Sequence, residues 1–113
     1  MHEMSLAEGV QQLVEETARR EKASRVRLVV LEIGRLSAVE PGALEFCFEA
    51  VSKGSIAQGA RLEIRIVPGA GWCQRCAETV PMAERYADCP KCGGHPVEPT
   101  SGTEMRVREI EIE

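Results

Sequence analysis

The first half of the chain alternates between helical and strand patterns of apolar residues. From Ser5 to about Ala23, apolar side chains recur every three or four residues, which is the period of an amphipathic helix. Ser5 and Glu8 have the spacing of a capping box, so we expect this helix to begin at Ser5, one short step after His2. Its predicted apolar stripe consists of Leu6, Val10, Leu13 and Val14.

A second helix is predicted to begin at Pro41, because proline suits the first helical position, where a missing N–H needs no partner. Lys53 and Gly54 supply a cation and a left-handed cap at its end. Cys47 has apolar neighbours and is expected to be a buried helical residue without chemistry. The predicted stripe consists of Leu44, Cys47, Phe48 and Val51.

Three segments have strand patterns. Residues 26–33 are apolar in both alternating sets, which indicates a central strand covered on both faces. Residues 62–66 alternate as a half-buried strand does. In residues 105–113 the apolar positions change parity near Arg108 and Glu109, which suggests a β-bulge. The predicted fold is α+β, with two helices packed on a small, mainly antiparallel three-stranded sheet.

Four cysteines form two CxxC pairs, separated by twelve residues. Two tight turns can aim four sulfurs at one ion, so this spacing predicts a tetrahedral zinc site. Such a closed site leaves no position for substrate, so we expect structural Zn(II). His95 is a spare donor that could replace one thiolate, although an exposed side chain is the expected state. The predicted zinc ligands are Cys73, Cys76, Cys89 and Cys92.

The cysteine segment is predicted to be a zinc-ribbon-like module inserted into the α/β part. Breaker residues cluster at 68–71, beside a change in composition, and mark a natural hinge. We therefore expect an α/β domain of residues 1–68 plus 103–113 and a zinc-binding domain of residues 69–102. The stretch between the cysteine pairs looks too short and too polar to bury a core, so the module should depend on its metal.

Charge and composition exclude several functional classes. Fourteen Lys and Arg against eighteen Asp and Glu give a net charge of −4, which opposes nucleic-acid binding. No apolar run approaches a membrane span of about 20 residues, and no export signal is visible. Paired CxxC motifs then indicate thiolate ligands in the cytoplasm. The chain shows no nucleophile–base pair or phosphate-binding loop, so we do not expect an enzyme.

The N-terminus offers a second metal site. A histidine in position two can present the α-amine, its own amide nitrogen and its imidazole as fused chelate rings. The amine is expected to be that of Met1, because His2 is too large for removal of the initiator methionine. The next amide or the Glu3 carboxylate can occupy a fourth place. Nitrogen-rich sets of this kind suit Ni(II) or Cu(II).

A combined pattern is found in the CxxC pairs and in residues 1–6, 31–37, 39–40, 46–48, 54–60 and 110–112. It resembles the HypA/HybF family of hydrogenase maturation nickel chaperones, over essentially the whole chain. The resemblance implies that His2 is the principal nickel ligand, assisted by the N-terminal amine and Glu3, with Ni(II) as transient cargo. It also implies work with a HypB-type GTPase in delivering nickel to the large subunit of [NiFe]-hydrogenase, and a homodimer is compatible with it. In many relatives a histidine directly follows the second CxxC, where this chain has Gly93.

Two other functional classes use similar cysteine pairs. A zinc-ribbon nucleic-acid or protein adaptor is favoured by the cysteine module alone, but charge opposes a nucleic-acid role, and Trp72 and Tyr86 make a sparse stacking surface. A rubredoxin-like iron carrier also has two CxxC turns. The short separation of the pairs and the lack of surrounding aromatic residues count against iron.

Overall fold

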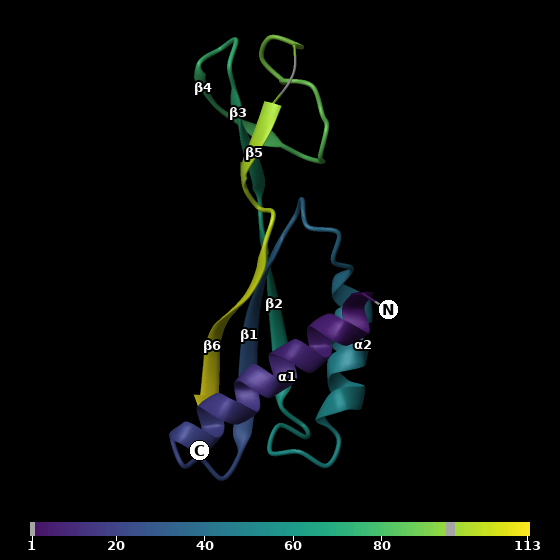
Figure 1. The fold of residues 1–113 in the computed structure, drawn as a ribbon, viewed down its shortest axis with the longest axis vertical. Coiled ribbons are helices and arrows are strands. Elements are labelled where there is room, and N and C mark those ends of the chain that lie inside the picture. The colour runs from purple at the N-terminus through teal and green to yellow at the C-terminus, as the bar shows by residue number, and fades with distance from the viewer. Residues whose placement is uncertain (1, 95–96) are drawn as a thin grey trace. The chain divides into compact units, whose positions relative to one another are not determined.

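The computed structural model describes residues 2–94 and 97–113. It contains two helices and two three-stranded sheets, with strand orders β2-β1-β6 and β4-β3-β5 (Figure 1). The α+β class is therefore confirmed. The elements in chain order are α1 (His2–Arg20), β1 (Val26–Gly34), α2 (Pro41–Ser52), β2 (Arg61–Val67), β3 (Gly69–Cys73), β4 (Glu78–Met82), β5 (Val97–Ser101) and β6 (Met105–Ile112).

The chain forms two compact units. The first consists of Met1–Leu31, Val39–Arg65 and Arg106–Glu113, and the second of Glu32–Ala38 and Ile66–Met105. The predicted domains, residues 1–68 plus 103–113 and residues 69–102, are meant as parts that fold separately. Their boundaries stay a prediction. Neither helix in the described part of the chain has the length and apolar composition needed to cross a membrane.

Helix α1 buries a narrow stripe of alanine and valine residues, together with Gln11, in the first unit. Leu13 was predicted to belong to this stripe, but 44% of it is exposed. The buried positions recur mostly at intervals of three or four residues and so form one face of the helix. The direction of Leu13 around the helix axis lies at the edge of that face, which leaves its side chain partly in solvent. The small side chains let α1 approach α2 closely, and the two helices contact each other (Figure 1). The buried residues of α1 are Ala7, Val10, Gln11, Val14 and Ala18.

Helix α1 also begins earlier than predicted. It starts at His2, and Ser5 is an exposed residue inside it rather than its cap. The added turn is stabilised by Glu3, whose carboxylate lies at the positive end of the helix dipole. A Glu3 carboxylate oxygen also accepts a hydrogen bond from the backbone N–H of Glu40, at 3.3 Å. The capping-box argument considered local residues alone and could not include this contact.

Helix α2 agrees with its predicted limits. Glu40 is the N-cap, and its carboxylate accepts from the backbone N–H of Ala43 at 2.5 Å, with Pro41 at the first helical position. Gly54 follows the helix with a φ of +77°, as the predicted left-handed cap requires. Cys47 is 4% exposed, so its burial is confirmed.

Strand β1 is the central strand of its sheet, and all its residues except Arg27 and Glu32 are buried, as predicted. Strand β6 is antiparallel to β1, because the backbones of Arg25 and Glu113 exchange hydrogen bonds. Strand β2 ends beside the end of β1, where Arg35 N–H donates to the Val67 carbonyl at 2.9 Å. This is the arrangement of a parallel pair joined by a helical crossover, here α2.

The second unit has an apolar core of its own. Strand β3 pairs antiparallel with both β4 and β5, and Val80 and Met82 of β4 point into the core. The expectation that the stretch between the cysteine pairs buries no core is therefore wrong. It failed because part of the core comes from distant positions, Leu36 and Val97. The complete cluster consists of Leu36, Cys73, Val80, Met82, Cys89 and Val97.

Candidate metal centre

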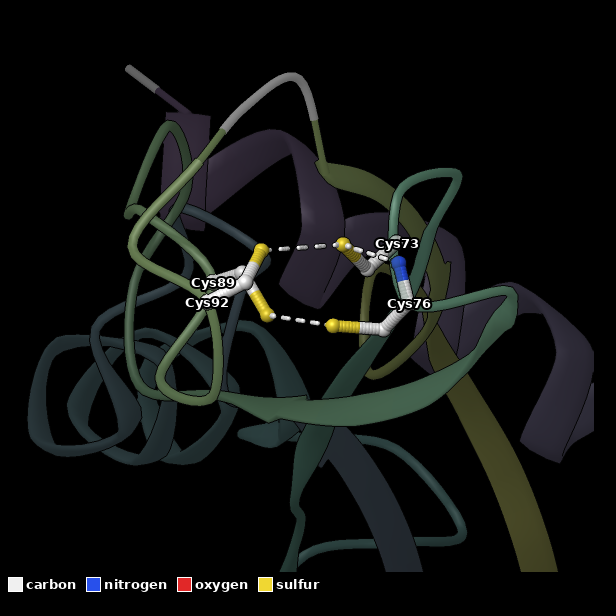
Figure 2. Close-up of side chains that lie close together, drawn as sticks. All are labelled: Cys73, Cys76, Cys89 and Cys92. Carbon is white, nitrogen blue, oxygen red and sulfur yellow. Dashed lines mark hydrogen bonds between the residues drawn. The ribbon is translucent and has the colours of Figure 1, made fainter.

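Four cysteine side chains point toward a common centre in the second unit (Figure 2). Their four Sγ atoms all lie within 4.8 Å of one another. The Sγ atoms of Cys73 and Cys92 are 3.7 Å apart, and those of Cys76 and Cys89 are 3.9 Å apart. The structure thus brings together the four cysteines that the CxxC spacing singled out.

The spacing of the sulfurs matches a tetrahedral zinc site. A Zn–S bond of about 2.3 Å places the sulfurs of a regular tetrahedron about 3.8 Å apart. The separations of 3.7 and 3.9 Å in two of the sulfur pairs lie on either side of that value, and all the others are within 4.8 Å. A disulfide would require about 2.05 Å, so these sulfurs are separate donors. The four residues therefore fit a closed, four-thiolate Zn(II) centre.

Backbone N–H groups in each CxxC turn point at the sulfurs. Cys76 N–H donates to Cys73 Sγ, and Lys91 N–H donates to Cys89 Sγ, each at 3.4 Å. The second turn is also closed by Gly93 N–H, which donates to the Cys89 carbonyl at 2.8 Å. These donors favour negatively charged sulfur and hold each turn in a shape that can bind a cation.

Without a cation, the thiols of Cys76 and Cys89 differ in how easily they ionise. The backbone N–H of Cys92, and then that of Lys91, lowers the pKa of Cys89 to about 7. In contrast, hydrogen bonding with the Cys92 sulfur, and then burial, raises the pKa of Cys76 to about 12. A bound divalent cation would compensate the charge of the remaining thiolates. Protons compete with the metal for these sulfurs, so metal affinity should fall as pH falls.

Each CxxC pair is followed by a residue with a positive φ, but that residue differs between the two turns. Gly93 follows the second pair with a φ of +72°, and Ala77 follows the first pair with a φ of +53°. The left-handed region costs an L-residue about 1–2 kcal/mol, whereas glycine enters it readily. Ala77 is therefore a strained residue.

Replacing Ala77 by glycine should stabilise the zinc-loaded protein by up to about 1 kcal/mol, and Gly93→Ala should destabilise it by about the same amount. Chemical unfolding of the zinc-loaded forms measures both. Ala87→Gly is the matched control, since Ala87 does not have a positive φ, and this change should destabilise. If Ala77→Gly destabilises as much as the control does, Ala77 carries no strain.

The residues predicted to bind nickel lie at the start of α1. His2 is exposed and Glu3 is half-buried, and the His2 Nδ1 lies 3.4 Å from a Glu3 carboxylate oxygen. His2 is the first residue of α1 and does not precede the helix, which corrects the expectation. The N–H of Glu40, followed by the His2 ring, lowers the pKa of Glu3 below its ordinary value. Met1 and His95 lie outside the described residues.

Sequence reasoning missed the part that Glu40 plays beside these residues. Glu40 is 37 positions from Glu3, and its backbone N–H, not its side chain, makes the contact. No local pattern could reveal such a contact. The one cue near Glu40 was Pro41, which indicated where α2 begins. The start of a helix has backbone N–H groups without an intrahelical acceptor, and these can bind a carboxylate.

A sequence model of the family described as "Hydrogenase/urease nickel incorporation, metallochaperone, hypA" matches residues 1–112. The chain belongs to the HypA family. It is 78% identical to the hydrogenase maturation factor HypA of Dechloromonas aromatica over 113 residues, which are the whole of both chains. It is 61% identical to the HypA of Albidiferax ferrireducens, again over the whole of both chains.

Two solved HypA structures share this fold. The solution structure of the Ni metallochaperone HypA from Helicobacter pylori is 30% identical and has a TM-score of 0.71, with 97% of this chain and 96% of that chain covered. Another HypA solution structure is 31% identical, with a TM-score of 0.75 and coverage of 100% and 97%. HypA proteins form a metallochaperone family of hydrogenase maturation, not a family of enzymes. Membership of that family favours a metallochaperone over the adaptor and iron-carrier alternatives.

Proposed function

We propose that this HypA chain binds Ni(II) at its N-terminus and helps to insert it into the large subunit of a [NiFe]-hydrogenase during maturation. The observation that carries the proposal is the HypA family match over residues 1–112. Hydrogenase is proposed as the client, although the family description also includes urease, because the curated relatives are hydrogenase maturation factors.

The proposed nickel ligands are the amine of Met1, the His2 imidazole and the Glu3 carboxylate, with backbone amide nitrogen completing the set. The exposure of His2 leaves its ring accessible to an ion from solvent. Because the pKa of Glu3 is lowered, its carboxylate stays ionised at pH values below those at which a glutamate ordinarily takes up a proton. The first N–H groups of a helix have no intrahelical acceptor, so a helix that begins at His2 leaves its first amides available. Nitrogen and oxygen donors of this kind suit Ni(II).

The position of the proposed site favours release as well as binding. A cation at a helix N-terminus is opposed by the helix dipole, and the Glu3 carboxylate offsets part of that repulsion. Because the side chain of His2 is 57% exposed, a competing ligand from another protein can reach the ion. Nickel is thus held as cargo in a site from which it can be passed on.

The proposed resident metal is Zn(II), held by Cys73, Cys76, Cys89 and Cys92. When bound, zinc would cross-link the two CxxC turns. Its four thiolate ligands would leave no open coordination position for chemistry. Two of the four cysteines, Cys73 and Cys89, are also part of the apolar core of the second unit. This combination supports a structural role for the metal.

The proposed partners are a HypB-type GTPase and the hydrogenase large subunit, and a homodimer fits the proposal. The net charge of −4 supports protein partners rather than nucleic acid, and no membrane role is proposed. We place this work in the cytoplasm, where reduced cysteines can remain thiolate ligands.

Expression of this chain should restore hydrogenase activity to a bacterial strain that lacks its own HypA. Activity measured in cell extracts, with expression of the chain verified, checks this. The Cys47→Ala variant is a suitable positive control, because Cys47 is buried in α2 and lies outside the four-cysteine cluster. Normal expression of the chain without any recovery of hydrogenase activity would contradict the proposed client.

A further inference from the structure

The two CxxC turns, here called knuckles, each carry a cation just before their second cysteine. The first knuckle is Cys73–Cys76 with Arg75, and the second is Cys89–Cys92 with Lys91. Four thiolates and one Zn(II) carry a net charge of −2, so a cation beside each knuckle offsets the charge of the loaded centre. Their side chains are therefore placed where they can act on the metal centre.

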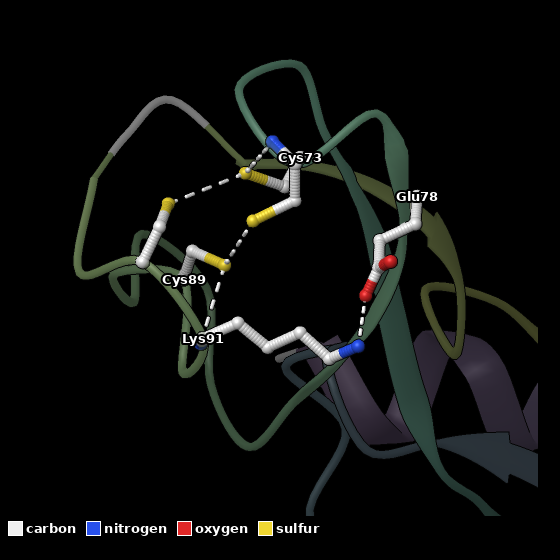
Figure 3. A network of polar contacts seen from close by, with 6 residues as sticks. Cys73, Glu78, Cys89 and Lys91 are labelled. Carbon is white, nitrogen blue, oxygen red and sulfur yellow. Dashed lines mark hydrogen bonds and ion pairs between the residues drawn. The ribbon is translucent and has the colours of Figure 1, made fainter.

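Lys91 makes one contact with its own knuckle and one with the flank of the other. Its backbone N–H donates to the Sγ of Cys89 at 3.4 Å. Its side chain extends away and forms an ion pair with Glu78 (Figure 3). Glu78 is the first residue of β4, two positions after the first knuckle ends. One residue thus links a ligand sulfur of the second knuckle to the strand that leaves the first.

The side chain of Arg75 extends from the first knuckle toward the second. Its Nη1 lies 3.1 Å from the place where a Cβ on Gly94 would be, so the guanidinium covers the exit of the second knuckle. The Gly94 carbonyl accepts from Cys89 N–H at 2.9 Å, which ties that exit to a ligand residue. The absence of a side chain at Gly94 leaves room for Arg75. The cationic side chain of each knuckle therefore extends toward the residues that follow the other knuckle: Lys91 toward Glu78, and Arg75 toward Gly94.

We propose that the Glu78–Lys91 ion pair is a clamp across the two knuckles that positions the four sulfurs and slows loss of the bound metal. The clamp rests on the proposed four-thiolate zinc centre. Glu78 and Lys91 are positioning residues, since neither belongs to the set of sulfur donors. Arg75 lies beside Gly94 without a recorded ion pair among the described residues, so its contribution is expected to be the weaker one.

The clamp should act on metal exchange more than on folding. Both partners are partly exposed, at 59% for Lys91 and 42% for Glu78, and exposed ion pairs contribute little to folding stability. Each knuckle supplies two of the four sulfurs, so complete release of the ion requires the two knuckles to separate. The ion pair exists only while they are together, so it opposes that separation directly.

Zinc transfer to a chromogenic chelator tests the clamp. We expect Glu78→Lys and Lys91→Glu each to release zinc about fivefold faster than the wild-type chain, which is the size that an exposed ion pair permits. The double variant, with the two charges exchanged, should return to within about twofold of the wild-type rate. Added salt should accelerate release from the wild-type chain and slow release from the single reversals, because it screens attraction in the first and like-charge repulsion in the second.

A matched control is available on β2 in the first unit. Glu63 and Arg65 form an exposed ion pair of 2.9 Å, and both belong to the first unit, whereas the cysteines of the cluster belong to the second. Exchange of their charges, or reversal of either one, should leave the rate of zinc release unchanged. The neutral variants Glu78→Gln and Lys91→Gln should accelerate release in the same direction as the reversals, by a smaller factor.

The visible spectrum of the Co(II)-substituted protein reports on the sulfur geometry itself. We expect the single reversals to change the tetrahedral thiolate bands and the double exchange to restore them. Wild-type release rates in both single variants would overturn the clamp, as would a double variant that releases zinc as fast as the singles. If the wild-type chain does not retain zinc, the proposed zinc centre fails and the clamp with it.

Discussion

The Cys73→Ala variant should lose stoichiometric zinc, and its second unit should loosen. Cys73 is 1% exposed, ends β3 and belongs to both the metal cluster and the apolar core. Zinc binding contributes an apparent ~10–16 kcal/mol in small metal-held modules, so loss of one ligand removes the main term that holds the knuckles together. Metal analysis measures the zinc content, and amide hydrogen exchange locates the loosening. We expect the fastest exchange in the two knuckles.

The helices and the β2-β1-β6 sheet should persist in this variant, because their core is built from other residues. Cys47→Ala is the matched cysteine control and should keep its zinc, with a modest loss of stability from the lost packing in α2. The two-unit description would be wrong if Cys73→Ala also lost its helical circular dichroism. Full zinc retention by Cys73→Ala would instead contradict its assignment as a ligand.

The His2→Ala variant should lose Ni(II) binding while its zinc content and thermal stability stay nearly unchanged. The His2 side chain is 57% exposed, and the contact recorded for it among the described residues is the one with Glu3. Removal of the ring therefore takes away a proposed ligand without opening a core. Calorimetric titration of untagged protein with Ni(II) measures the effect. Ser5→Ala, an exposed change in the same helix, should leave the isotherm unaltered.

The pH dependence gives an independent check on the same ligands. Nickel must displace protons from an imidazole and an amine, so binding should weaken as pH falls below neutrality. The pKa of Glu3 is lowered, so its carboxylate stays ionised through this range and should not cause the loss. A nickel isotherm that His2→Ala leaves unaffected would rule out the N-terminal site.

The parts of this structure that the sequence predicted correctly depend on local cues. Pro41 and Gly54 marked the two ends of α2 because proline and glycine restrict or extend backbone angles at their own positions. The CxxC pairs predicted the sulfur cluster because two intervening residues fix the shape of a tight turn. Each of these cues acts within a few residues, so tertiary structure could not override it.

The errors came from contacts between distant residues. The first turn of α1 is stabilised by Glu3, whose partner N–H belongs to Glu40. The core of the second unit depends on Leu36 and Val97, which lie far from β4 in the sequence. The left-handed backbone at Ala77 was also hidden, because an alanine gives no sign that it occupies a glycine's conformation.

The most direct test of the account is Ni(II) titration of the untagged, zinc-loaded chain beside the same chain with its N-terminal amine blocked by acetylation. We predict one zinc in both forms, one nickel bound by the open form, and nickel binding that is lost or strongly weakened in the acetylated form. Acetylation removes only the amine, so the helices and the cysteine cluster stay as they are. Equal nickel binding by the two forms would contradict the proposal that this HypA chain carries nickel at its N-terminus.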